Sequence, residues 1–269
     1  MALDYTNEAP EGWKTYDDFV KDMNTPGYRL VGTEELAGKE LEFDFEGEKL
    51  SLKFAAKTVA WKTADDEGVD EYEAVNVQKD TYIVTYKISK KNDSAQTVVF
   101  NLKSLRAISV YNYIKQGEIR VEPRFAQVFK GGVILGGTPT GIAPYRTKEL
   151  IALKALYTYS EEHTYEHYYI TASHFCWKCF RGEQKGQVSI EPAEYWKFDE
   201  HQFVFGWCEV VIPTSPIWFI DYGDDPEYAL RETGTFFNCN PDGSIRLEKA
   251  GATIEKLNQT YYPSKYDKI

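Results

Sequence analysis

Residues 157–169 bring together five tyrosines and two histidines, side chains that can form hydrogen bonds and exchange protons. A short turn over 160–162 would join two strands into a hairpin. With the period of two residues that a strand imposes, five side chains would then point to one side: Tyr157, Tyr159, Tyr165, His167 and Tyr169. A face of phenols and an imidazole is unusual for a plain core, because buried polar groups need partners. The pattern favours the inner wall of a small-ligand cavity.

Trp207 and Glu209 are two residues apart, so they too would share one face of a strand. A glutamate in an aromatic cavity has a raised pKa, because burial penalises the charged carboxylate. Glu209 is therefore predicted to be a general acid or base near neutral pH, with His167 as a second proton-transfer group. Tyr157 and Tyr159 would bind a carbonyl, phenolate or carboxylate and stabilise developing negative charge. Such groups serve enolisation, isomerisation, hydration, decarboxylation or cyclisation without a cofactor.

Each of these residues also has a structural interpretation. A tyrosine on a barrel strand is often only partly buried and covers the core without lining a cavity. Glu209 could form an ion pair at a barrel rim, and His167 could be a hydrogen-bonded core histidine. We expect no metal site, because His163 and His167 are four residues apart, which suits a helix and not this hairpin. Cys176 and Cys179 would point to opposite faces of a strand, so a zinc or redox pair is not expected either.

The elements that would position these residues are strands. Among 269 residues, 20 are tyrosine and 15 phenylalanine, which favour strands, so we predict an all-β fold. A short helix is expected over 16–23, before Pro26. The strands expected in the first half are 41–45, 50–54, 58–61, 72–77, 82–88, 97–102 and 107–114. Short strands at regular spacing indicate an up-and-down barrel or a sandwich.

The second half repeats the order of the first. Three pairs of segments correspond: 36–45 with 149–159, 82–88 with 203–209, and 98–102 with 217–221. Residues 130–144 between the halves are rich in Gly and Pro, which predicts a connection, and they lack a phosphate-binding glycine motif. We therefore expect an N-terminal barrel with a lead-in over 1–130, a connection over 131–148, and a C-terminal barrel that carries the site over 149–269, with a few short helices at the edges.

The charge pattern excludes some classes of partner. The formal net charge is −11, and the acidic residues are spread over both halves. No basic stripe is present, so neither nucleic acid nor an anionic membrane surface is an expected partner. The first residues lack a signal-peptide pattern, and no apolar run reaches the length of a membrane span. We expect a cytoplasmic protein with reduced cysteines.

Several segments together resemble the MoaF family, named after molybdenum cofactor biosynthesis protein F. They are GGTPTG at 136–141, YTYS at 157–160, YEH at 165–167, WKCFRG at 177–182, and WCE at 207–209 with Pro213. The resemblance covers nearly all of the chain and is most specific in the second half. It implies two tandem calycin-like (lipocalin-like) barrels. The sequence shows no phosphate-binding loop and no basic pocket for a pterin phosphate, so it does not support a role in cofactor synthesis.

Each half is also similar to the phenolic acid decarboxylases, a single-barrel calycin family. This similarity implies that Tyr157, Tyr159 and Tyr165 orient a substrate and that Glu209 is catalytic. The family's arginine falls near Gln187. A substrate carboxylate would therefore lose its bidentate partner, which disfavours decarboxylation.

The first half lacks these groups, because Phe43 and Phe45 stand in place of the tyrosines and Ile88 in place of the glutamate. The sequence thus predicts a cofactor-independent lyase or isomerase/cyclase in the second barrel, acting on a small aromatic or conjugated carbonyl metabolite. The predicted catalytic residues are Glu209, His167, Tyr157 and Tyr159, and the predicted substrate-binding residues are Tyr165, Tyr169, Trp177, Trp207 and Gln187. The alternative is a lipocalin-like protein that binds such a molecule without converting it. Two barrels could pack within one chain or across a homodimer, and the sequence leaves both open.

Overall fold

The computed structural model describes residues 27–116, 122–210, 212–240 and 242–263. Every regular element in this part of the chain is a strand, so the prediction of an all-β fold is confirmed. The prediction of short helices at the edges is wrong for the described residues, because the chain between the strands forms turns and irregular segments there. The helix expected over 16–23 lies outside the described residues. Among the described residues, no helix is long and apolar enough to cross a membrane.

The first half forms a closed antiparallel barrel in which each strand pairs with its neighbour in sequence. Its strands are β1 (Glu40–Phe45), β2 (Glu48–Phe54), β3 (Thr58–Lys62), β4 (Glu67–Gln78), β5 (Thr81–Lys87), β6 (Ser94–Asn101), β7 (Arg106–Ile114) and β8 (Phe125–Ile134). The barrel closes where Phe43 of β1 lies opposite Ile134 of β8. Alternate residues face inward and form an apolar core that includes Phe43, Phe54 and Phe100.

The second half repeats this order. Its strands are β9 (Tyr145–Arg146), β10 (Leu153–Ser160), β11 (His163–Thr171), β12 (His174–Arg181), β13 (Val188–Asp199), β14 (Gln202–Trp207), β15 (Thr214–Asp221), β16 (Arg231–Cys239) and β17 (Ile245–Gln259). Strands β10 to β17 close a barrel through the β10–β17 and β12–β13 pairings, and β9 adds to the outside of β13. The prediction of two tandem barrels is therefore confirmed, although β8 was not among the seven strands predicted for the first half.

The segment between the barrels differs from its prediction. The residues 131–134, expected to begin the connection, are the last four residues of β8. Gly131 and Gly132 serve close packing there, because a Cβ on Gly132 would lie 2.3 Å from the Asp44 carbonyl oxygen of β1. A Cβ on Gly131 would lie 2.6 Å from the Pro144 carbonyl oxygen. Glycine in this strand thus marks close backbone approach and not a loop.

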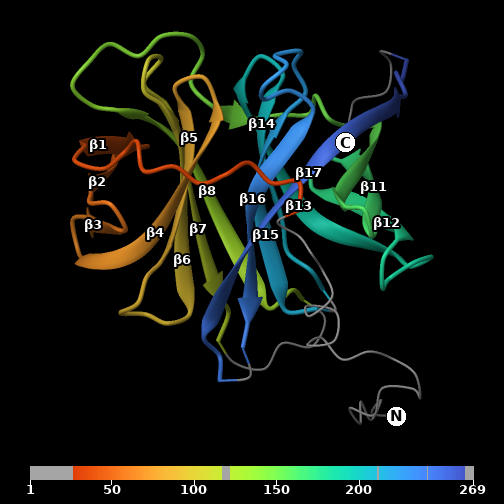
Figure 1. Ribbon diagram of the computed structural model, residues 1–269, viewed down its shortest axis with the longest axis horizontal. Coiled ribbons are helices and arrows are strands. Elements are labelled where there is room, and N and C mark those ends of the chain that lie inside the picture. The colour runs from red at the N-terminus through yellow and green to blue at the C-terminus, as the bar shows by residue number, and fades with distance from the viewer. Residues whose placement is uncertain (1–26, 117–121, 211, 241, 264–269) are drawn as a thin grey trace.

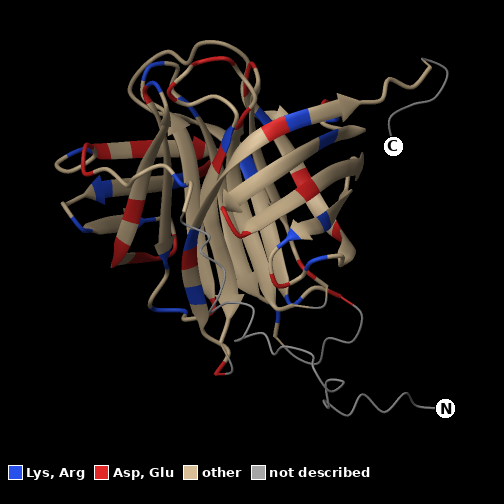
Figure 2. Cartoon of the chain, turned by 45° about the vertical axis from the view of Figure 1, so that its right-hand side comes forward, with Lys and Arg blue, Asp and Glu red and all other residues tan. Residues whose placement is uncertain are grey.

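The barrels lie side by side, with β4 to β8 of the first facing β13 to β17 of the second (Figure 1). The outward side chains of these strands form one buried cluster, in which Phe129 of β8 stacks on Trp196 of β13 at 6.0 Å between ring centroids. Acidic and basic residues are interspersed over both barrels (Figure 2). The extent of this shared apolar face explains why the two halves form one body.

A hydrogen-bonded side chain within this interface gives a first prediction. The Gln127 amide nitrogen of β8 donates to Ser215 Oγ at 2.6 Å, to the Pro216 carbonyl at 2.9 Å and to the Trp207 carbonyl at 3.1 Å. Gln127→Leu keeps the volume but leaves these acceptors unpaired, so it should lower the free energy of unfolding by about 1–3 kcal/mol in urea titrations. The control is Gln187→Leu, at an exposed glutamine, with an expected change below about 0.5 kcal/mol. Equal effects would contradict the role of Gln127.

Candidate functional site

The interior of the second barrel is where the predicted residues converge. Strands β10 to β17 turn their inward residues into one aromatic cluster. Seven predicted residues line it and are at most 7% exposed: Tyr157, Tyr159, Tyr165, His167, Tyr169, Trp177 and Trp207. Glu209, also 7% exposed, follows β14 in the same alternation. The hairpin is as predicted, with Tyr157 opposite Tyr165 and a turn over 161–162. This geometry gathers phenols, indoles, an imidazole and a carboxyl in one buried space.

Three phenols form a cluster that we call the phenol cluster: Tyr157, Tyr169 and Tyr222. The Tyr157 hydroxyl is 2.6 Å from that of Tyr169 and also hydrogen-bonds the hydroxyl of Tyr222. The hydroxyls of Tyr169 and Tyr222 are 3.2 Å apart. Burial, with the nearby phenols, holds the pKa of Tyr157 and Tyr169 well above the usual range. All three are thus neutral hydrogen-bonding groups at physiological pH.

Tyr159, predicted to act with Tyr157, instead pairs with a buried carboxyl. Its hydroxyl donates to Glu232 Oε1 at 2.5 Å, and Glu232 on β16 is fully buried. Burial raises the pKa of Glu232 to about 8, although the hydrogen bond from Tyr159 opposes the shift. Glu232 is therefore mostly protonated at neutral pH. A neutral carboxylic acid beside a phenol is an arrangement that can donate hydrogen bonds to a developing oxyanion.

Glu209 belongs to a second polar group of the interior. It accepts a hydrogen bond from the Trp207 indole nitrogen at 3.0 Å, and burial, followed by the neighbouring Glu191 carboxyl, raises its pKa well above the usual range. Glu191 is itself fully buried and accepts hydrogen bonds from Ser189 Oγ at 2.5 Å and from the Val210 backbone N–H at 2.9 Å. Two carboxyls in one dry site cannot both be ionised at low cost. The raised pKa therefore favours the protonated form of Glu209.

His167 lies between rings at the centre of the cluster. Its imidazole stacks on Tyr157 at 4.0 Å between centroids and meets the edges of Phe175 and Trp207 at 5.3 and 5.7 Å. Burial lowers the pKa of His167 to about 3. The imidazole is consequently neutral at physiological pH and packs as a ring among rings in the free protein.

The barrel interior contains Gln184 and not the predicted Gln187. Gln187 is exposed, in the turn after β12, and does not reach the interior. Gln184, three residues earlier, is buried, and its Oε1 accepts a hydrogen bond from the Tyr165 hydroxyl at 3.0 Å. Tyr165 also meets the Trp177 ring edge-on at 6.0 Å. The residues 182–187 form a tight turn, so only some of their side chains can point inward.

Several polar atoms of this interior have no hydrogen-bond partner among the described residues. They include His167 Nδ1, Trp177 Nε1, Tyr195 OH, Trp218 Nε1 and Glu232 Oε2. Native proteins leave few buried polar atoms unpaired, because each costs about 1–3 kcal/mol. A group of such atoms in one barrel interior offers hydrogen-bonding capacity to water or to a polar ligand. Glu232 and Trp218 lie on neighbouring strands, where Trp218 is opposite Gly234.

Two buried tyrosines provide a test of this interpretation. Tyr195→Phe removes a hydroxyl without a partner among the described residues, so the free energy of unfolding should change by less than about 0.5 kcal/mol. Tyr159→Phe leaves Glu232 Oε1 without its donor and should lower the free energy of unfolding by about 1–3 kcal/mol. Urea unfolding of both variants measures the difference. A loss in Tyr195→Phe as large as in Tyr159→Phe would show that the Tyr195 hydroxyl is bonded in the free protein.

Sequence reasoning missed six inward-facing groups: Gln184, Glu191, Tyr195, Trp218, Tyr222 and Glu232. The period of two was a usable signal for two of them, since Trp218 and Tyr222 alternate with Ile220 on one face. Glu232 shares its face with Gly234 and Phe236. The first barrel has no equivalent set, because Phe43, Phe45 and Ile88 occupy the corresponding places in an apolar core.

The fold and site together define a class: a tandem of two closed eight-stranded antiparallel barrels, of which the second has a polar aromatic interior. The model of the MoaF N-terminal domain matches residues 11–116, and that of the MoaF C-terminal domain matches residues 144–260. The chain therefore belongs to the MoaF family. It is 25% identical over 263 residues to Protein MoaF of Klebsiella aerogenes, covering 90% of this chain and 94% of that protein.

One solved structure is similar over part of the chain. It is a crystal structure from Burkholderia vietnamiensis, described as that of a provisionally assigned beta-lactamase, with 8% identity and a TM-score of 0.33. The matched region covers 40% of this chain and 96% of the chain in that structure. A likeness at this level carries no argument about fold or function.

Proposed function

We propose that the second barrel is the active site of a cofactor-independent lyase or isomerase/cyclase that acts on a small, uncharged aromatic or conjugated carbonyl compound. The observation that carries this proposal is the pair of buried carboxyl groups, Glu209 and Glu232, whose pKa values are raised by burial in one aromatic interior. Perturbed acids in an enclosed space are what acid–base catalysis requires near neutral pH.

The two carboxyls support different roles. Glu232 and Tyr159 form a neutral donor pair, with Glu232 Oε2 free of a partner among the described residues, so together they would stabilise an enolate or phenolate oxygen. Glu209 with Glu191 would donate a proton to the substrate and take one back. The phenol cluster and the rings of Trp207 and Trp218, which stack at 6.1 Å, would orient a flat substrate.

The polarity of the interior limits the substrate class. Among the described residues, no lysine or arginine is buried in the second barrel. A carboxylate would thus enter a dry space without a cationic partner, at high cost. This supports an uncharged substrate and agrees with the missing arginine near Gln187. Neutral His167 would hydrogen-bond the substrate, and its low pKa makes it a weaker base than a carboxylate.

The alternative function is a carrier that binds such a compound unchanged. The phenol cluster favours this alternative, because its three hydroxyls bond one another and accept or donate no hydrogen bond with a carboxyl or imidazole among the described residues. Ordered phenols can hold a ligand without any proton transfer.

A binding screen tests both functions. Phenols and conjugated ketones would be titrated while tryptophan emission is recorded, since Trp177, Trp207 and Trp218 are in the barrel interior. We expect saturable quenching that is lost in the Tyr157→Phe/Tyr159→Phe double variant and kept in Tyr145→Phe, at an exposed tyrosine. Mass spectrometry of the bound compound then separates the enzyme, which converts it, from the carrier, which does not. Absence of quenching by every compound would contradict both.

A further inference from the structure

The first barrel has a pocket of about 240 Å³ at one end, and none of its lining residues belongs to the second barrel. Leu50, Trp61, Tyr86 and Ile88 belong to the interior core of this barrel and line the pocket's inner part. Gln96 and Ser109 add an uncharged polar wall, where the Gln96 amide nitrogen donates to Ser109 Oγ at 2.8 Å. The pocket is therefore a cup inside the barrel mouth and not a groove on its surface.

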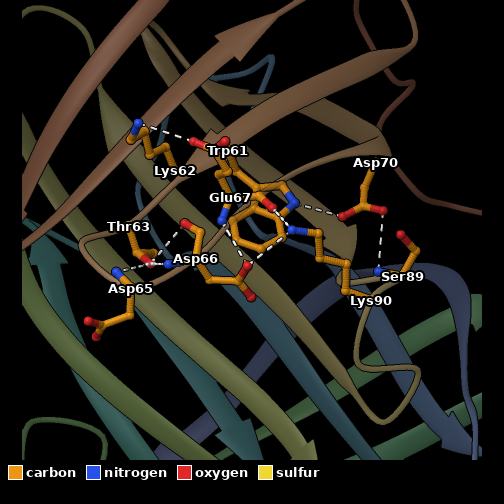
Figure 3. A network of polar contacts seen from close by, with 9 residues as sticks. All are labelled: Trp61, Lys62, Thr63, Asp65, Asp66, Glu67, Asp70, Ser89 and Lys90. Carbon is orange, nitrogen blue, oxygen red and sulfur yellow. Dashed lines mark hydrogen bonds and ion pairs between the residues drawn. The ribbon is translucent and has the colours of Figure 1, made fainter.

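The Trp61 ring is held in place as one wall of this cup (Figure 3). Its indole nitrogen donates to Asp70 Oδ2 at 2.7 Å, and Asp70 Oδ1 accepts the Ser89 backbone N–H at 3.2 Å. Gly68 lies beneath the ring, where a Cβ would come within 2.6 Å of Trp61 Cζ2. The Tyr86 ring is nearly parallel to that of Trp61, with centroids 6.5 Å apart. Fixed, nearly parallel rings form a platform for a flat apolar group at little entropic cost.

Three lysines and two carboxyls surround the rim of the cup, and Asp66 interacts electrostatically with both Lys90 and Lys91. Lys130 pairs with Glu48, and Lys90 pairs with Asp66 at 3.2 Å. Lys91 also lines the pocket, with its ammonium 5.6 Å from the centroid of the Tyr111 ring, and forms no ion pair with a described residue. An anionic group at the rim would complete the charge balance beside Lys91.

We propose that this pocket binds a single-ring aromatic carboxylate, with its ring against Trp61 and Tyr86 and its carboxylate at the rim beside Lys91. The volume sets the size, because pockets for drug-sized ligands are about 300–1,000 Å³ and this one is smaller. The ligand class differs from the uncharged compound proposed for the second barrel, where no buried cation is present among the described residues. The first barrel is thus a second, separate binding site of the chain.

Benzoate is the probe and benzamide, its uncharged analogue, the comparison. The protein would be labelled with ¹⁵N-tryptophan, which gives one indole signal for each of its six tryptophans. The Trp61 signal is assigned by its loss in Trp61→Phe. We expect benzoate to shift this signal saturably and benzamide to bind about two- to fivefold more weakly, the range for one exposed ion pair. Lys91→Met should weaken benzoate binding by the same factor. Lys103→Met, at an exposed lysine outside the pocket, should leave benzoate binding unchanged.

A filled-pocket variant keeps the test decisive. Val128 lines the pocket and is 40% exposed, so Val128→Trp should fill the space without disturbing the core. Benzoate binding should be lost in this variant and unchanged in Tyr159→Phe, whose substitution lies in the second barrel. Three results would overturn the proposal: no shift of the Trp61 signal up to the solubility limit, equal binding to Val128→Trp, or equal affinity for benzamide. Failure of the proposed function would appear separately, as the absence of quenching by uncharged compounds.

Discussion

Between pH 5 and pH 8, wild-type protein is expected to lose roughly 3.5 kcal/mol more of its free energy of unfolding than the Glu232→Gln variant. The cause is the raised pKa of Glu232, about 8 in the folded protein against 4.5 for an unperturbed glutamate. Between these values the folded state holds a proton that the unfolded state has released, so unfolding sets a proton free. Stability therefore falls by about 1.4 kcal/mol per pH unit. The proton-linked stability is fully present below pH 4.5 and is lost as the pH rises through about 8.

Glutamine suits this test because it reproduces the protonated acid. Its amide oxygen can accept the hydrogen bond from Tyr159, and its amide nitrogen replaces the protonated Oε2 as a donor. Glu209 titrates in both proteins, so its contribution cancels in the comparison. Urea titrations at pH 5, 6, 7 and 8 measure the two slopes. Glu71→Gln, at an exposed glutamate, is the control and should follow the wild type. Parallel curves for wild type and Glu232→Gln would show that Glu232 is ionised in the folded protein.

Alternation of side chains explains why so much of the site could be predicted from the sequence. A barrel has only an inside and an outside, so the period of two assigns Tyr157, Tyr159 and His167 to the interior without any knowledge of the strand order. The same rule places Glu209 beside Trp207. The repeat of strands between the halves then gives two barrels, because each half contains the same succession of segments.

What could not be predicted depends on contacts between distant strands. Tyr159 and Glu232 are 73 residues apart, and they meet because the barrel closes and brings β10 and β16 to either side of β17. The resemblance to the decarboxylases places Gln187 at the site; it is exposed whereas Gln184 is buried, and turn residues have no period that tells the two apart. Gly131 and Gly132 resemble loop residues in the sequence, but they belong to a strand. Glycine is needed there because the Pro144 and Asp44 backbones come too close for a Cβ.

Turnover should fall by about 10²- to 10⁴-fold in Glu209→Gln, with the affinity for the converted compound nearly unchanged. In the proposed site, Glu209 donates and recovers the proton that the reaction needs, whereas the amide of glutamine has no such proton. Its shape and its hydrogen bond from the Trp207 indole, 3.0 Å long in the wild type, can be kept. The neighbouring Glu191 keeps its bonds to Ser189 and to the Val210 backbone, so the fold around the site should survive. The assay is conversion of the compound that the quenching screen identifies, followed with binding on the same sample.

Glu194→Gln is a closely matched control for this prediction. Glu194 also accepts a hydrogen bond at 3.0 Å from a tryptophan two residues away, Trp196, but its tryptophan belongs to the cluster between the barrels and not to the barrel interior. Loss of turnover in Glu209→Gln with full turnover in Glu194→Gln would place the proton transfer in the interior. Equal turnover in both variants would remove Glu209 from the mechanism. If wild type binds the compound without converting it and Glu209→Gln binds it equally well, the second barrel is a carrier, since a binding site needs the shape of this carboxyl but not its proton.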